Sequence, residues 1–217
     1  MALPLDQPAV LRELIRTRLA GTLAHADIES AHRAQALSAV NTIVRSYLPA
    51  DPVAAAVLVP IVDRADGLTV LFTRRASHLR HHAGQISFPG GRIEPTDSGP
   101  LEAALRESEE EVGLAREHVA PVGYLNPQLV VSGFWVTPVV AFVAPECGLT
   151  LDTREVESTF EAPLAHILDP ANHRPSERTL GTKTVRVHEI PFGPYNIWGA
   201  TAAMLLELYR VLVGRPG

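Results

Sequence analysis

Four glutamates stand within five consecutive positions of this chain, at Glu107, Glu109, Glu110 and Glu111. Like charges three and four residues apart on a helix repel each other, so such a run either faces water or binds a cation. At 100° per residue, Glu107, Glu110 and Glu111 gather on one patch of a helix surface. Three carboxylates on one patch suit Mg²⁺ or Mn²⁺, which prefer oxygen ligands and keep several water molecules. We therefore expect Glu107 and Glu111 to bind a divalent metal ion, with Glu110 assisting.

A helix that begins near Leu101 must present these carboxylates. The signals that delimit it are Asp97 or Ser98 as a cap, Pro100 near the first turn, and Gly113 as a left-handed end. The predicted core stripe consists of Leu101, Ala104, Leu105, Ser108 and Val112. Glu109 falls on the opposite flank with Glu102, nearer Arg106, so we do not expect it to bind metal.

The segment before the helix helps to decide between a metal site and a solvated acidic face. Phe88-Pro89-Gly90-Gly91 ends an apolar stretch with two glycines, which permit backbone conformations and close approaches that other residues do not. A carbonyl group freed at Gly91 can serve as a further oxygen ligand. Because a solvated helix needs no such segment before it, the combination favours a metal site.

These residues resemble the signature of the Nudix hydrolase family. The signature reads Gly, five residues, Glu, seven residues, then Arg-Glu-apolar-x-Glu-Glu-x-Gly-apolar, and here Gly91 opens it and residues 106–114 close it. The chain departs from it in having Asp97 in place of the first Glu, one extra residue before Arg106, and Ser108 at the apolar position. The resemblance implies an α/β/α sandwich with a mixed sheet and a metal-dependent diphosphatase. We expect Arg106 to pair with a carboxylate and fix its orientation.

A second motif resembles the coenzyme A signature found in one Nudix subfamily. It comprises residues 71–76, Arg80, Gly84 and residues 88–91, and only Phe72 departs from the pattern. Residues 198–202, Trp-Gly-Ala-Thr-Ala, are similar to the same subfamily, and the resemblance spans roughly Ala54 to Gly214. It implies that coenzyme A and its thioesters are cut to 3′,5′-ADP and 4′-phosphopantetheine or its acyl form. The expected substrate contacts are Arg75, Arg80, Gly84, Phe88 and Gly90.

Two other functions stay open. One is a Nudix diphosphatase that acts on ADP-ribose or dinucleotides. The other is a catalytically silent ligand-binding regulator, which we would expect to have lost carboxylates of the metal patch.

Charge indicates where a phosphate could bind. The net charge of −5 argues against a nucleic-acid or membrane-surface protein and requires any phosphate site to be locally basic. One short segment meets that requirement with Arg74, Arg75, His78, Arg80, His81 and His82. We favour phosphate binding there over a merely solvated loop.

The general base must come from elsewhere, because carboxylates that ligate a metal ion are poor proton acceptors. Glu155 and Glu157 are the acidic residues best placed in the sequence, and we prefer Glu155. The polar stretch 173–183 is interpreted as a solvated loop, with a mobile substrate loop carrying Arg174, Arg178 or Lys183 as the alternative.

The remaining pattern predicts the framework of one domain, residues 51–217, preceded by a helical extension, residues 1–50, packed on the domain or on a partner subunit. Predicted helices are 8–19, 28–47 and 197–213, and predicted strands are 54–62, 68–72, 119–124, 136–143 and 184–190. Asp66-Gly67 predicts a hairpin turn, and Pro138 predicts an edge or bulged strand.

Composition sets the remaining expectations. With 217 residues and 46% hydrophobic content, the chain can bury one sizeable core. The single cysteine, Cys147, excludes an internal disulfide, and the charged first 20 residues contain neither a signal peptide nor a membrane span. We expect a cytoplasmic enzyme with a small-molecule substrate, no nucleic-acid or membrane partner, and the potential to form a homodimer.

Overall fold

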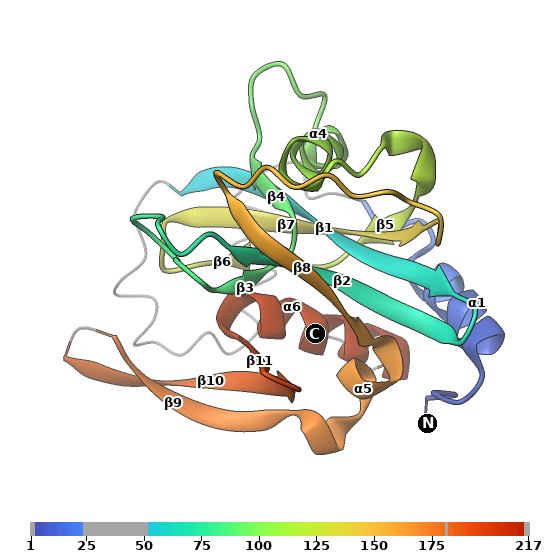
Figure 1. Cartoon of the computed structure of the whole chain (residues 1–217). Coiled ribbons are helices and arrows are strands. Elements are labelled where there is room, and N and C mark those ends of the chain that lie inside the picture. Colours follow the sequence, from blue (N-terminus) through green and yellow to red (C-terminus); the bar gives the residue numbers. More distant parts are fainter. Residues whose placement is uncertain (1–2, 24–51, 181, 215–217) are drawn as a thin grey trace.

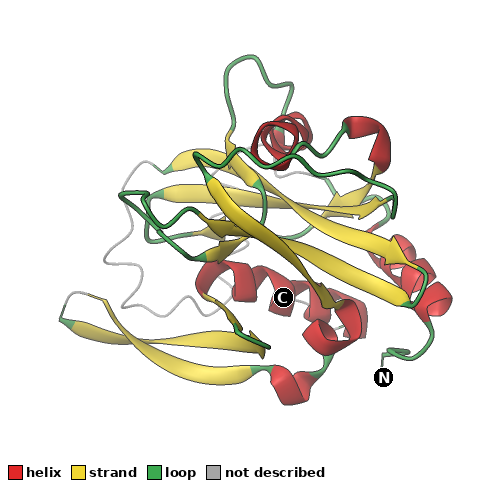
Figure 2. Cartoon of the chain, in the orientation of Figure 1, coloured by secondary structure: helices red, strands yellow, loops and turns green. Residues whose placement is uncertain are grey.

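The computed structural model describes residues 3–23, 52–180 and 182–214. Three layers make up this part of the chain: helix α4 covers one face of a mixed eight-stranded sheet, and α1, α5 and α6 cover the other face (Figures 1 and 2). This architecture confirms the predicted α/β/α sandwich. The helices are α1 (Pro8–Leu19), α4 (Pro100–Val112), α5 (Leu164–Leu168) and α6 (Gly199–Val213). The large sheet contains β1 (Val53–Arg64), β2 (Gly67–Arg75), β3 (Ile86–Ser87), β4 (Gly90–Arg92), β5 (Val119–Tyr124), β6 (Gln128–Leu129), β7 (Phe134–Val143) and β8 (Val156–Pro163).

Strand β1 lies at the centre of this sheet. On one edge it pairs in parallel with β7 over residues 53–62, and on the other edge it pairs antiparallel with β4 in its first half and β2 in its second half. Its side chains alternate between the two cores, as the period of two in a strand requires. Ala55, Val59 and Ile61 pack on the side of α6, whereas Ala56 and Leu58 pack on the side of α4.

Strand β7 corrects one prediction. The presence of Pro138 predicted an edge or bulged strand, but β7 lies inside the sheet, with β1 on one edge and β5 and β6 on the other. The chain on that second edge leaves the ladder between Tyr124 and Gln128, opposite Pro138, whose carbonyl accepts a hydrogen bond from Leu125 N at 3.1 Å. A proline is tolerated there because the neighbouring strand is interrupted at its position.

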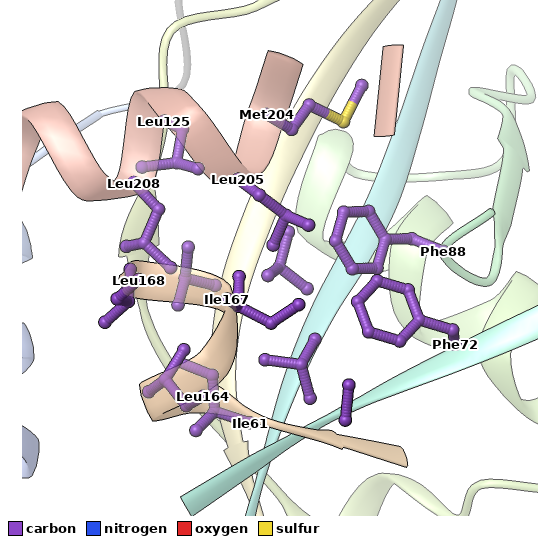
Figure 3. Packing of buried hydrophobic residues seen from close by; sticks show 14 of the residues in the cluster. Ile61, Phe72, Phe88, Leu125, Leu164, Ile167, Leu168, Met204, Leu205 and Leu208 are labelled. Atoms are coloured by element: carbon purple, nitrogen blue, oxygen red, sulfur yellow. The ribbon is translucent and has the colours of Figure 1, made fainter. Parts of the chain in front are cut away.

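The larger core explains why Phe72 departs from the coenzyme A signature. Its ring is fully buried and stacks on Phe88 at 5.3 Å and on Phe160 at 5.2 Å between ring centroids. Figure 3 shows Phe72 and Phe88 side by side, facing the leucines of α5 and α6. An aromatic ring at this position extends the stack and so fills the core.

Helix α1 coincides with the prediction and packs directly on the sheet and α6. Leu11, Ile15 and Leu19 are fully buried in the larger core cluster. The C-terminal end of the helix approaches β5 so closely that a Cβ at Gly123 would lie 2.5 Å from the carbonyl oxygen of Leu19. The Thr22 hydroxyl donates to that carbonyl and accepts a hydrogen bond from the backbone N–H of Tyr124. The predicted helix 28–47 lies outside the described residues, and the domain boundaries stay a prediction.

A second, three-stranded sheet corrects the interpretation of residues 173–183 as a loop. It consists of β9 (Arg174–Leu180), β10 (Lys183–Phe192) and β11 (Tyr195–Trp198), and β9 and β10 form the long hairpin at the lower left of Figure 1. Among the described strands, β9 pairs only with β10, and the polar residues of this edge strand obscure its period in the sequence. The guanidinium of Arg178 pairs with Glu189 and lies over the ring of Trp198 at 5.2 Å from its centroid.

Other boundaries differ from prediction by short stretches. Strand β5 is as predicted, β1, β2, β7 and β10 are longer, and α6 begins two residues later because Ile197 and Trp198 belong to β11. Strand β8 was not predicted, and it includes Glu157. Among the described helices, none is both long and apolar enough to cross a lipid bilayer.

Candidate active site

Helix α4 carries the glutamates and is fixed at both ends. Its N-cap is Gly99 without a side-chain cap, so the prediction of Asp97 or Ser98 as the cap was wrong. At the other end Gly113 adopts the predicted left-handed conformation, with its N–H bonded to the Glu109 carbonyl at 3.0 Å. The buried face consists of Ala103, Ala104, Ser108, Glu111 and Val112. This face is displaced from the predicted stripe, and Leu101 and Leu105 are only half-buried.

Two glycines of β4 bring the backbone against the helix carboxylates. The N–H of Gly90 donates to Glu111 Oε2 at 3.2 Å, and a Cβ at Gly91 would lie 2.5 Å from the carboxyl carbon of Glu107. Glu111 is 5% exposed, and burial raises its pKa to about 8 in the metal-free protein. Burial also raises the pKa of Glu107. Because burial disfavours their negative charge, a nearby positive charge would stabilise both carboxylates.

Arg106 on α4 connects Asp97, which precedes the helix, to two of the helix carboxylates. It donates from Nε and Nη2 to the two carboxylate oxygens of Asp97, each at 3.0 Å, and from Nη1 to Glu107 at 2.9 Å and Glu110 at 3.1 Å. The hydrogen bonds from Arg106 lower the pKa of Asp97. The aspartate that replaces the glutamate of the signature thus binds the arginine with both oxygens. This role of Asp97 was not foreseen.

Glu110 differs from the other two carboxylates. Its side chain is 60% exposed and forms an i, i+4 ion pair with Arg106. The structure thus brings Glu107 and Glu111 to the glycines and leaves Glu110 at the rim. On the far flank, Arg116 pairs with Glu102 and Glu109, so Glu109 lies with Glu102 as predicted but contacts Arg116 instead of Arg106.

Ser108 replaces the apolar residue of the signature without leaving an unsatisfied group. Its side chain is fully buried, and its hydroxyl donates to the Ala104 carbonyl at 2.6 Å. A hydroxyl satisfied one turn back along its own helix adds no buried unpaired donor.

Two charged residues from outside the helix approach the carboxylates. The positive charge of Arg75, the last residue of β2, acts on Glu111, and the Arg75 Nε atom is buried without a hydrogen-bond partner among the described residues. The negative charge of Glu155, just before β8, acts on both Glu107 and Glu111. Glu157 instead points to Arg74, 3.8 Å away, and both are well exposed. The charge of Glu155 thus acts on both helix carboxylates, whereas Glu157 lies against Arg74.

The loop between β2 and β3 carries the remaining basic residues. It closes through two backbone hydrogen bonds of 3.0 Å, from Arg75 N to Gln85 O and from Gly84 N to Arg75 O, and Gly84 has the positive φ of 68° that this return requires. Arg80 is exposed on the loop. Phe88, a predicted substrate contact, packs in the core with 3% exposure.

The donor set fits a hard divalent cation. Among the described residues, no three or more His, Cys, Asp or Glu side chains converge into a ready-made metal cage. Mg²⁺ does not need one, because it is commonly held by one or two carboxylates together with waters and substrate phosphates. Glu107 and Glu111 are the two helix carboxylates that lie against the β4 glycines, and no side chain stands between Glu107 and the backbone at Gly91.

Comparison with known proteins gives the family. The model of the NUDIX domain matches residues 52–204. The chain is 42% identical over 163 residues to the "Uncharacterized Nudix hydrolase NudL" of Escherichia coli O7:K1, covering 75% of this chain and 84% of that protein, and 43% identical over the same length and shares to NudL of Salmonella newport. A MutT/nudix family protein from Enterococcus faecalis aligns with a TM-score of 0.47 at 16% identity, over 88% of this chain and 76% of that one. The chain belongs to the Nudix family and is a Nudix hydrolase.

Proposed function

We propose that this hydrolase uses Mg²⁺ or Mn²⁺ to cleave the diphosphate bond of coenzyme A and its thioesters, giving 3′,5′-ADP and 4′-phosphopantetheine or its acyl form. The observation that carries the proposal is the juxtaposition of Glu107 and Glu111 with Arg75, whose buried Nε has no partner among the described residues. Binding a diphosphate requires a cation and a hydrogen-bond donor close together. This site combines carboxylates suited to a divalent metal ion with a guanidinium group.

The residues divide the work as follows. Glu107 and Glu111 would hold the metal, with the Gly91 carbonyl and Glu110 as auxiliary groups, and Arg106 keeps Glu107 oriented. A bound metal ion supplies acidification of a water molecule and neutralisation of phosphoryl charge. Glu155 is then the group that accepts a proton from the attacking water.

The choice of coenzyme A rests on the loop 76–84 and its spacing. Gly84 closes the loop onto Arg75, and Arg80 stands exposed between them, so two guanidinium groups lie on one short closed segment. Coenzyme A carries a 3′-phosphate in addition to its diphosphate. A second basic residue on the loop that follows Arg75 suits a substrate with this extra phosphate better than it suits ADP-ribose.

A substrate panel tests the proposal. Coenzyme A, acetyl-coenzyme A, ADP-ribose, NADH and diadenosine polyphosphates are each incubated with Mg²⁺ or Mn²⁺, and the products are separated by chromatography. Release of 3′,5′-ADP from coenzyme A at the highest kcat/KM supports the proposal. A preference for ADP-ribose or a dinucleotide would assign that compound as the substrate instead. Binding without turnover would indicate the silent regulator, although the presence of Glu107, Glu110 and Glu111 argues against that function.

Arg80→Ala should raise KM for coenzyme A roughly ten- to hundredfold with a smaller effect on kcat. The reason is that a charge-assisted hydrogen bond contributes about 1.5–3 kcal/mol. Steady-state kinetics measures this, with Arg116→Ala as the matched control because Arg116 pairs with Glu102 and Glu109 on the far flank of α4. Unchanged KM and kcat in Arg80→Ala would remove Arg80 from the substrate site.

Glu155→Gln should lower kcat while Mn²⁺ affinity stays near normal, because a base can be neutralised without disturbing the metal ligands. Glu157→Gln is the control, since Glu157 faces Arg74. Turnover and Mn²⁺ affinity are measured together in both variants. Wild-type turnover in Glu155→Gln would show that the water loses its proton without this residue.

We also propose a cytoplasmic setting, consistent with the single cysteine, Cys147, and a small-molecule substrate instead of a nucleic acid or membrane. Size-exclusion chromatography with light scattering tests the proposed homodimer.

A further inference from the structure

The turn that carries Glu155 is hydrogen-bonded to the C-terminal end of helix α4. The N–H of Thr150 donates to the Val112 carbonyl at 2.8 Å, and the N–H of Asp152 donates to the Glu111 carbonyl at 2.9 Å. The last carbonyls of a helix have no partner within the helix, so these bonds satisfy groups that would otherwise be free. Glu111 therefore faces the candidate metal site with its side chain and holds the 152–155 turn with its backbone.

Asp152 organises the turn itself. Its carbonyl accepts from the N–H of Glu155 at 3.0 Å and from the N–H of Val156 at 2.9 Å. Its carboxylate accepts from the N–H of Arg154 at 3.0 Å and forms an ion pair with the Arg154 guanidinium. These bonds fix the conformation of the turn. Its position also depends on contacts with other segments on the side away from α4.

Those contacts come from the chain that follows β2. The N–H of Ala76 donates to the Glu155 carbonyl at 2.8 Å, and the His78 imidazole contacts the Arg154 carbonyl through Nε2 at 3.1 Å. Because a carbonyl oxygen can only accept, His78 must carry its proton on Nε2. Among the described residues, His78 is the one side chain of the 76–84 loop with a hydrogen bond to the 152–155 turn.

We propose that His78 is a positioning residue that couples the 76–84 loop to the Glu155 turn. The inference rests on the role proposed above for Glu155. Arg80, two residues from His78, is the expected phosphate contact of the same loop, so a loop engaged by substrate phosphate holds the turn through His78. In this way substrate binding and placement of the base are connected by one imidazole.

Glu155 is exposed and has no side-chain hydrogen bond among the described residues, so the position of its carboxylate depends on the backbone of the turn. Losing the bond to the Arg154 carbonyl leaves the attachments at α4 and Ala76 intact but frees the outer part of the turn. A catalytic group displaced by a fraction of an ångström works more slowly, although it remains present.

Three variants of the 217-residue chain test the proposal. His78→Ala should lower kcat about three- to tenfold, the range expected for one hydrogen bond, with KM and Mn²⁺ affinity unchanged. His78→Gln should restore kcat, because its amide offers an N–H donor at about the same reach. His188→Ala is the matched control, an exposed histidine on β10 of the smaller sheet. A fall in His78→Ala without recovery in His78→Gln overturns the proposal.

A double-mutant cycle with Glu155→Gln decides whether His78 acts through Glu155. We expect His78→Ala to have no further effect on kcat in the Glu155→Gln background. Equal fold losses in both backgrounds would overturn the inference. The cycle is run on whichever substrate of the panel the wild type hydrolyses fastest, so an error in substrate assignment does not affect it.

Hydrogen exchange gives a readout that does not need turnover. Mass spectrometry of residues 150–157 should show faster amide exchange in His78→Ala than in the wild type and in His78→Gln. Identical exchange in the three chains overturns the inference, whatever the activity. If the wild type hydrolyses no substrate of the panel, the proposed function fails, and exchange still decides the positioning role.

Discussion

Glu107→Gln and Glu111→Gln are each expected to lower kcat by several orders of magnitude while the fold survives. Glutamine has nearly the same shape as glutamate but lacks the charge that a divalent cation requires. Glu111 is buried, and its Gly90 hydrogen bond can be kept by an amide oxygen, so its loss of charge does not destabilise the metal-free protein. The measurements are kcat, Mn²⁺ affinity by calorimetry and Tm.

Glu109→Gln serves as the control for this experiment. Its carboxylate pairs with Arg116 on the exposed flank, where ion pairs contribute roughly 0–1 kcal/mol, so turnover should stay near wild type. Equal losses of kcat at Glu109 and Glu107 would contradict the assignment of the metal-binding face.

Gly91→Ala and Gly90→Ala should fail in different ways although the residues are neighbours. A Cβ at Gly91 meets the Glu107 carboxylate, the end of a side chain that can move aside. The fold should persist, but kcat should fall about a hundredfold because the proposed metal ligand Glu107 is displaced. A Cβ at Gly90 would lie 2.4 Å from the Ala56 carbonyl oxygen and 2.6 Å from Val57 Cα, and φ there is +152°. Backbone cannot yield, so stability should fall by about 3 kcal/mol or more.

Thermal unfolding and kinetics together distinguish the two variants. At this chain length, a loss of 3 kcal/mol corresponds to a fall in Tm of about 6–12 °C, which we expect for Gly90→Ala only. If Gly91→Ala unfolds at the lower temperature and Gly90→Ala keeps its Tm, the packing of β4 against β1 and α4 is wrong.

The elements with a strong hydrophobic period were predictable from the sequence. Helix α1 and strand β5 have the predicted bounds, and the helix that carries the glutamates was located with its Gly113 end. Strand β8 was missed because it pairs with β2 at the edge of the sheet and mixes Ser158 and Glu161 with apolar residues. Its two buried residues, Val156 and Ala162, lie near opposite ends of the strand and leave no alternating pattern in the sequence.

Only those features of the candidate site that follow from the spacing of residues within one helix were predictable. Periodicity placed Glu107, Glu110 and Glu111 on one patch, but it could not show that Glu110 would pair with Arg106 at the rim or that Asp97 would pair with the same arginine. The hydrogen bond from the N–H of Asp152 to the Glu111 carbonyl depends on how the segment before β8 packs against the end of α4. Such contacts follow from the tertiary fold and leave no periodic trace in the sequence.

The docking of α1 has a consequence for how the molecule divides into parts. The family match begins at residue 52, whereas Leu11, Ile15 and Leu19 lie completely inside the larger core, and Gly123 leaves room for the chain that follows them. The stretch that the family model matches is therefore smaller than the stretch that contributes side chains to the core. A chain cut at residue 52 would present to water the apolar surface that α1 now covers, and such an exposed surface promotes self-association. In this protein the first residue of the family match and the first residue of the packed core are therefore different.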